Sequence, residues 1–461
     1  MSTDLGPATN PYLLGNYAPV HDERDDAPLE IVGDLPASLR GRYLRNGPNP
    51  AFEPLGNYHL FDGDGMIHGI EIADGAASYH NRYIESAGLA AERRAGNALF
   101  GGLAEFRFPP AELMAEVGVM KNTANTNIIS HAGRLLALME ACPPIELAAD
   151  LTTSGPWDFG GALTGAMTAH PKIDPATGEM LFFGYGPFPP YLRFHVVDAS
   201  GVLTTSVDID LPAPVMMHDF VVSATKVVFF DLPALFDLDA MLSGGTGIRW
   251  EPANGARIGI LDRAQPEAGV TWIEVDPFFA FHFLNGHDDG DAVVVEGCRS
   301  PRLNAAFGNE RLDEPITPLL HRWRVDPVAG TVTDTPLDDR FGDFPRIDDR
   351  MTGRRARYGY VATGQNNGSD DVMFNGFIKH DLVTNSSTEY SFGPDVMSGE
   401  VAFAADPDRD SEDGGWLMTF ATDASGDSAL IIVDAEALQE VARVRVPRRV
   451  PFGFHGNWFA A

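Results

Sequence analysis

The pattern that decides the fold is clearest in the stretch Phe194-His195-Val196-Val197-Asp198-Ala199-Ser200-Gly201. A run of β-favouring residues ends at an aspartate, and a turn of small residues and glycine leads into the next β-rich run. An aspartate at the first turn position can accept a hydrogen bond from the backbone two residues later, and glycine supplies the positive φ of a tight turn. The stretch is therefore typical of a β-hairpin.

The same hairpin pattern returns at nearly constant spacing, with its aspartate next at Asp262, Asp326, Asp381 and Asp434. A unit that recurs in this way is how radially repeated sheets appear in sequence. We predict an all-β fold, a β-propeller, and treat residues 1–461 as a single domain because no linker divides them. Two apolar segments, 110–117 and 234–242, are expected to form short helices over one face.

The charge balance excludes some partners. Lys and Arg number 33 against 65 Asp and Glu, a net charge of -32. Nucleic-acid binding depends on basic residues that neutralise phosphates, so no nucleic acid is expected as a partner. Electrostatic docking on anionic lipid is disfavoured for the same reason. Apolar contact with a membrane is left open, and the oligomeric state is not readable.

The cysteines and the N-terminus indicate the compartment. Cys142 and Cys298 are too few for a disulfide framework or a thiolate zinc site, and suit buried thiols in a reducing environment. The first residues lack the basic and apolar regions of a signal peptide, and no run approaches the roughly 18–20 apolar residues of a membrane span. These features predict a soluble cytoplasmic protein.

Four of the 13 histidines lie in unusually apolar or glycine-bound settings: His170, His218, His282 and His455. Neutral imidazole is the commonest protein ligand for metals, and an apolar surrounding excludes water. Taken singly, each is equally well explained as a hydrogen-bonded core histidine. Spacing alone does not say that the four converge.

Five long strings follow one another along the chain: Gly41-Arg42-Tyr43-Leu44-Arg45-Asn46-Gly47-Pro48-Asn49-Pro50, Phe61-Asp62-Gly63-Asp64-Gly65-Met66, Thr168-Ala169-His170-Pro171-Lys172, Met217-His218-Asp219-Phe220 and Val450-Pro451-Phe452-Gly453-Phe454-His455-Gly456-Asn457-Trp458. In this order they resemble the carotenoid cleavage oxygenases, a family with plant and microbial carotenoid cleavers, bacterial lignostilbene dioxygenases and the retinoid isomerohydrolase of the eye.

The resemblance implies a seven-bladed β-propeller whose short helices and loops cap the iron face. It implies one non-haem Fe(II) per chain, held on the axis by four histidines that map onto His170, His218, His282 and His455. The implied reaction is the oxidative cleavage of an alkene C=C bond with O2 to give two carbonyl products. The protein would then be an oxidoreductase, a carotenoid- or stilbene-cleaving dioxygenase.

The resemblance also implies three carboxylates that orient the ligand histidines. Glu140 and Glu400 match the first and third, whereas Asp343 stands where the family has a glutamate. Its side chain is one methylene shorter, so either the backbone approaches or a water bridges the gap. Thr126 matches a threonine that crowds one open iron position; an ordinary strand threonine is the alternative.

Three residue positions are used to predict the substrate. The branch that cleaves stilbenes and phenylpropenoids recognises a para-hydroxyl group with a lysine before the first carboxylate and a tyrosine upstream. This chain has Met139 and, in a loose alignment, Phe106 at those positions, while Phe61, whose equivalent stacks on the phenol ring, is retained. Loss of the polar contacts weakens selection for a hydroxyl. We therefore expect an apolar apocarotenoid, a carotenoid or a non-phenolic aryl alkene.

Three alternatives are kept. Another residue could hold a phenol, which would make the protein a 4-hydroxyphenyl alkene-cleaving oxygenase. A propeller without chemistry would be a binding scaffold. An isomerohydrolase would need an apolar membrane-inserting patch, and the segment 232–242 carries Asp237 and Asp239, which suit a bilayer poorly.

Overall fold

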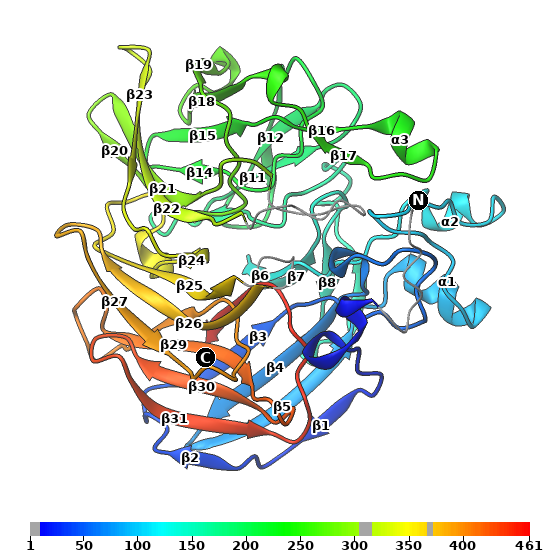
Figure 1. Cartoon of the computed structure of the whole chain (residues 1–461), viewed down its shortest axis with the longest axis vertical. Helices are drawn as coiled ribbons and strands as arrows, with labels where there is room; N and C mark the ends of the chain where they lie inside the picture. The colour runs from blue at the N-terminus through cyan, green and yellow to red at the C-terminus, as the bar shows by residue number, and fades with distance from the viewer. Residues whose placement is uncertain (1–9, 304–315, 367–371) are drawn as a thin grey trace.

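The computed structural model describes residues 10–303, 316–366 and 372–461. Across these ranges, seven antiparallel sheets of four or five strands are arranged as blades around a central axis (Figure 1). The chain visits the blades in order around the ring. The fold predicted from the sequence, a seven-bladed β-propeller, is confirmed.

The blades are numbered by their first appearance along the chain, and their strands are given from the axis outward. Blade 1 contains β32 (Gly456–Ala460), β3 (Gly41–Arg45), β4 (Met66–Ala73), β5 (Ala76–Tyr83) and β1 (Arg24–Asp26). Blade 2 contains β6 (Asn127–His131), β7 (Arg134–Leu138), β8 (Ile145–Leu147) and β9 (Thr153–Pro156). Blade 3 contains β10 (Lys172–Ile173), β11 (Met180–Tyr185), β12 (Leu192–Val197) and β13 (Leu203–Ile209). Blade 4 contains β14 (Val221–Val222), β15 (Lys226–Asp231), β18 (Ala256–Asp262) and β19 (Thr271–Val275).

The last three blades follow the same scheme. Blade 5 contains β20 (Phe283–Asp289), β21 (Ala292–Arg299), β22 (Leu319–Asp326) and β23 (Thr331–Pro336). Blade 6 contains β24 (Asp343–Arg346), β25 (Tyr358–Asn366), β26 (Val372–Asp381) and β27 (Ser386–Ser391). Blade 7 contains β28 (Ala402–Ala405), β29 (Gly415–Thr422), β30 (Ser428–Asp434), β31 (Gln439–Val446) and β2 (Ile31–Gly33).

The two ends of the chain close the ring. The C-terminal strand β32 pairs with β3 and becomes the inner strand of blade 1, while the N-terminal strand β2 pairs with β31 at the outside of blade 7. Exchanging strands between the ends ties the first and last blades together, so the closure of the ring does not depend on side-chain packing alone.

The recurrent aspartates lie where the hairpin pattern places them, at the end of the third strand of blades 3 to 7. Asp262 accepts a hydrogen bond from the Ala264 N–H at 2.9 Å, and Asp434 accepts one from the Glu436 N–H at 3.0 Å. The backbone bond two residues on, expected from the sequence, is thus formed. The period read from these aspartates is the period of the blades.

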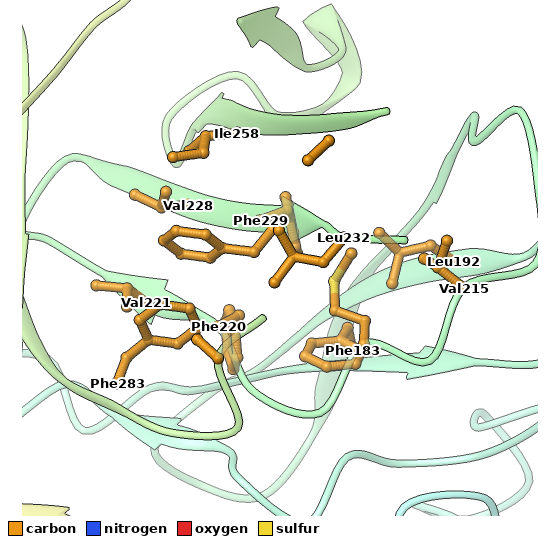
Figure 2. Close-up of a cluster of buried hydrophobic side chains, with 14 of the residues drawn as sticks. Phe183, Leu192, Val215, Phe220, Val221, Val228, Phe229, Leu232, Ile258 and Phe283 are labelled. Atoms are coloured by element: carbon orange, nitrogen blue, oxygen red, sulfur yellow. The ribbon is translucent and has the colours of Figure 1, made fainter. Parts of the chain in front are cut away.

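An aromatic core joins blades 3, 4 and 5. The rings of Phe183 and Phe220 are 5.2 Å apart, and Phe220 stacks on Phe229 at 6.1 Å (Figure 2). The cluster also includes Phe283 at the start of β20. Since rings of this size each bury a large apolar area, this core fixes the relative positions of three neighbouring blades.

The helices are few and short within the described ranges: α1 (Ala87–Ala95), α2 (Met114–Val117), α3 (Leu238–Leu242) and the 3-10 turns η2 (Pro11–Leu13), η3 (Gly15–Tyr17), η4 (Leu60–Asp62), η5 (Pro252–Asn254), η6 (Pro266–Ala268) and η7 (Asp349–Met351). Of the two expected helices, only the C-terminal part of each is helical. Residues Ala234–Phe236 instead form β16, which pairs with β17 (Ile248–Trp250). The Asp237 side chain accepts a bond from the Ala240 N–H and so starts α3 after that strand. Every described helix is too short or too polar to traverse a lipid bilayer.

Candidate metal centre

The four singled-out histidines occupy equivalent places in four blades. His170 precedes β10, His218 precedes β14, His282 adjoins β20 and His455 adjoins β32. Each of these strands is the innermost strand of its blade. Because the blades repeat around one axis, residues at the entrance to their inner strands meet at the centre. The propeller therefore brings together side chains that are hundreds of residues apart in sequence.

The four imidazoles form one buried cluster. One ring nitrogen from each lies within 4.8 Å of the others, and every one of the four residues is buried. The Nε2 atoms of His170 and His218 are 3.0 Å apart, and those of His218 and His282 are 3.1 Å apart. Two nitrogens bound to one ion at the usual imidazole distance of about 2.1 Å have this separation when their bonds meet near a right angle.

Three of the histidines contact a carboxylate through Nδ1. His218 contacts Glu140, His282 contacts Asp343 at 2.8 Å, and His455 contacts Glu400 at 3.0 Å. The carboxylates come from blades 2, 6 and 7, the blades that contribute no histidine to the cluster. Each blade thus supplies one member of a set of four imidazoles and three carboxylates.

Asp343 reaches His282 directly despite its short side chain. A register shift separates Asp343 and Pro345 in β24, and Phe344 between them has a φ of 50°. A positive φ is unfavourable for a bulky residue and is kept only where the surroundings require it. Of the two options for this shorter carboxylate, the structure has the direct contact.

Histidine tautomers with the proton on Nδ1 would make the cluster suitable for binding a cation. A histidine that donates its Nδ1 proton to a carboxylate presents the Nε2 lone pair on the other side of the ring. The Nε2 atoms of His218 and His282 would then face each other as two acceptors 3.1 Å apart. Two lone pairs this close repel each other, and a divalent cation bound between them would remove the repulsion. An all-imidazole donor set suits iron, zinc, copper and nickel.

Burial and neighbouring charge set the protonation of the cluster. Burial, followed by the adjacent imidazoles, lowers the pKa of His170 well below its ordinary value, so this ring is neutral. Burial alone would raise the pKa of Glu400, but the Arg346 guanidinium and His455 lower it to about 2. The carboxylate that faces His455 is therefore ionised.

Thr126 lies beside His455. It directly precedes β6, the inner strand of blade 2, and its carbonyl accepts the His455 N–H at 3.1 Å. Its hydroxyl donates to the Asn125 side chain at 3.1 Å. In blade 2 the threonine thus has the chain position that a histidine has in blades 3, 4, 5 and 1.

The three positions expected to contact substrate lie in different surroundings. Phe61, in η4, lies with its ring 5.4 Å from that of Phe454, next to His455. Met139 is half-buried and its sulfur is 3.9 Å from the Thr123 hydroxyl. Phe106 contacts the ring of Phe108 at 5.0 Å. Phe61 therefore lies next to the ring that precedes His455, and among the described residues Phe106 packs against Phe108 rather than against the four imidazoles.

Other residues of the centre were not singled out in the sequence. Phe281 and Phe344 lie with ring centroids 5.0 Å from those of His218 and His282 respectively. Tyr185 donates its hydroxyl to Glu140, and Arg346 contacts Glu400 at 3.0 Å. Arg346 follows Asp343 by three residues, so the sequence around Asp343 could have indicated it. No sequence feature indicated Tyr185, which lies at the end of a buried strand.

Comparisons with known proteins agree with this geometry. The family described as "Retinal pigment epithelial membrane protein" matches residues 17–460. The chain is 35% identical to a carotenoid 9,10(9',10')-cleavage dioxygenase 1 of Arabidopsis thaliana, covering 96% of this chain and 89% of that protein. It is 33% identical to a carotenoid cleavage oxygenase of Mycobacterium tuberculosis, covering 97% of each.

Solved structures give the same result. A lignostilbene dioxygenase of Pseudomonas brassicacearum superimposes with a TM-score of 0.91 at 30% identity, over 98% of both chains. An apocarotenoid oxygenase of Synechocystis, in a Glu→Asp variant, superimposes with a TM-score of 0.87 at 26% identity, covering 97% of this chain and 98% of that one. Both match the full propeller rather than a few blades.

Proposed function

The chain belongs to the family of the retinal pigment epithelial membrane protein and the carotenoid cleavage oxygenases, and on that premise we propose that a single Fe(II) is held by His170, His218, His282 and His455. The protein is an oxidoreductase, a dioxygenase that cleaves a carbon–carbon double bond with O2. The observation that carries the iron proposal is the buried cluster of four ligand nitrogens.

The residues around the cluster have distinct proposed roles. Glu140, Asp343 and Glu400 hold the Nδ1 protons of three histidines, which fixes each ring with Nε2 toward the metal. Thr126, beside His455, crowds one side of the centre. Phe281 and Phe344 exclude water from the imidazoles. Fe(II), when bound, would supply the activation of dioxygen.

We infer an apolar alkene as substrate: an apocarotenoid, a carotenoid or a non-phenolic aryl alkene. Phe61 offers an aromatic surface near His455, while Met139 and Phe106 offer no ammonium or hydroxyl to a phenol. The alternative, a 4-hydroxyphenyl alkene, is favoured by the likeness to the lignostilbene dioxygenase, which has the highest TM-score of the structures compared above.

The test is product analysis by mass spectrometry under isotope-labelled dioxygen. The iron-loaded protein would meet a hydroxystilbene, a propenyl phenol, a non-phenolic stilbene and an apocarotenal. Labelled aldehydes from the last two alone are the expected result. Efficient cleavage of the phenols would overturn the substrate proposal and leave the reaction class intact.

The same experiment needs a metal assay beside it. Retention of bound iron in His218→Ala would contradict the ligand assignment, and an iron-free wild-type protein that cleaves nothing would favour the inactive binding scaffold. A cytoplasmic location stays a prediction from the two free cysteines, Cys142 and Cys298, both of which are buried.

A further inference from the structure

Polar contacts link the inner strands at every blade boundary around the axis, within the described residues. They begin with the Asn127 side chain of blade 2, which donates to the Ala169 carbonyl before β10, and end with the Asn457 side chain of blade 1, which donates back to Asn127. The intervening contacts are Lys172–Asp219, Phe283 N–H to Asp219, His282–Asp343, Arg346–Glu400 and Gly456 N–H to Glu400. We call this set the axial ring.

His170 differs from the other three histidines in the contacts that hold its ring. His218, His282 and His455 each have a carboxylate at Nδ1. In the described part of the chain, His170 has no carboxylate contact; its backbone N–H donates to the Thr168 hydroxyl, and its Nε2 faces that of His218. Its position therefore depends on how its main chain is held.

The main chain around His170 is held on both sides. On one side, Asn127 donates to the Ala169 carbonyl at 2.8 Å. On the other, the Lys172 ammonium contacts Asp219 at 2.8 Å. The Asp219 side chain is only 2% exposed, so this ion pair is poorly screened by solvent.

Asp219 joins three histidine-bearing segments at once. It follows His218 directly, its Oδ1 contacts Lys172, two residues after His170, and its Oδ2 accepts the N–H of Phe283, directly after His282. One carboxylate thus sets the spacing between the entrances to β10, β14 and β20. A shift of any of these entrances would move a ligand nitrogen by a similar amount.

We propose that Lys172 and Asp219 are positioning residues of the metal centre, and that their ion pair fixes the backbone that carries His170, the one histidine of the four without a carboxylate contact at its ring in the described residues. The proposal rests on the metal centre proposed above. It assigns a role to two residues that touch neither the ion nor the substrate.

The competing interpretation is that the pair only stabilises the fold. Lys226 provides a control for loss of a lysine, because its ammonium contacts Asp262 at 2.8 Å and its side chain is 21% exposed, the same values as for Lys172, although Asp262 is 44% exposed and Asp219 only 2%. That pair joins β15 and β18 within blade 4 and is not part of the axial ring. Lys226→Met should therefore leave metal binding unchanged.

The experiment measures cobalt(II) binding by the full chain. Dissociation constants would be obtained by chelator competition, and the visible absorption spectrum would report the ligand field of the bound ion. Lys172→Met and Asp219→Asn should weaken binding by about 10–100-fold, the range usual for loss of a partner outside the ligand set, and should shift the spectrum. Lys172→Arg, which retains the charge, should recover most of the affinity but not the wild-type spectrum, because the guanidinium is larger and planar.

Melting temperatures of the metal-free variants show whether each variant is folded, and metal binding by the folded variants then separates the two interpretations. Wild-type affinity and spectrum in folded Lys172→Met and Asp219→Asn would overturn the proposal, as would equal losses in Lys226→Met. If either of the first two variants does not fold, Lys172→Arg decides, and an unchanged spectrum overturns the proposal. Failure of the wild-type protein to bind cobalt, or retention of the metal by His218→Ala, would instead overturn the proposed metal centre.

Discussion

Two sides of the metal centre are built in different ways: an axial side made of ion pairs and hydrogen bonds, and an aromatic side made of phenylalanine rings. On the axial side, charged and amide groups contact each other at defined distances, as in Arg346–Glu400 at 3.0 Å and His282–Asp343 at 2.8 Å. On the aromatic side, Phe61, Phe344 and Phe454 contact one another or the histidines through ring faces and edges. Directional bonds fix a geometry closely, whereas dispersion contacts tolerate substitution if volume is conserved.

The difference separates two properties of the protein. Changes on the axial side should alter metal affinity, and changes on the aromatic side should alter which alkene reacts while the metal stays bound. Each prediction below tests that separation, and the sizes of the expected effects decrease in order.

The largest effect is expected at the ligands. Replacing any one of the four histidines, for example His282→Ala, removes a ligand nitrogen and should lower iron affinity by more than about 100-fold, beyond the range for outer partners. Iron content after gel filtration measures it. His195→Ala is the control, because His195 is also buried but bonds Ser206 between β12 and β13, away from the axis. Stoichiometric iron in a ligand variant would remove that residue from the set.

Glu400→Gln should have the next largest effect. Glu400 contacts His455, the Gly456 N–H and Arg346, so loss of its charge leaves the guanidinium with only the more distant carboxylate of Asp349, at 3.6 Å. Iron affinity should fall about 10–100-fold, and the free energy of unfolding should fall by about 3–5 kcal/mol, as for other broken buried pairs. Chelator competition and denaturant titration measure the two effects. An unchanged affinity would mean that His455 is oriented by packing alone.

Asp343→Glu should weaken the centre, although it restores the residue that the family resemblance calls for. The Asp343 carboxylate already reaches His282 at 2.8 Å, and the adjacent bulge at Phe344 is built around the shorter side chain. An extra methylene must displace its neighbours, which typically costs about 1–3 kcal/mol. Thermal unfolding and iron affinity measure the change. Tighter iron binding in this variant would show that the aspartate is a defect rather than an accommodated substitution.

The sequence predicted the parts of the molecule that repeat. The aspartate period gave the propeller because Asp198, Asp262 and their equivalents end the third strand of successive blades. The resemblance named the four histidines and their carboxylates. It did not give the direct Asp343 contact, which depends on a backbone bulge, or the Tyr185 hydroxyl on Glu140, which depends on how blades 2 and 3 face each other.

Local pattern also failed where tertiary pairing decided the outcome. Residues Ala234–Phe236 are apolar and adjoin a helix, yet they form a strand because β17 pairs with them. Propensity is a weak guide for a segment of three residues, since cross-strand bonds and burial outweigh it. The axial ring could not be predicted for a similar reason: each of its contacts joins two blades, and a sequence without its fold does not show which residues face each other.

Met139→Lys tests the proposed substrate selection and should have the smallest effect. A lysine at this half-buried position, directly before Glu140, would place an ammonium where the phenol-cleaving relatives are expected to have one. We expect kcat/KM for a hydroxystilbene to rise about tenfold, within the range that a single polar contact gives in substrate discrimination. Iron content should be unchanged, because no ligand and no member of the axial ring is altered. Met351→Lys, at a half-buried position in η7, controls for a general effect of added charge. An equal rise in both variants, or a loss of iron in Met139→Lys alone, would mean that the two sides of the centre are not separable at this residue.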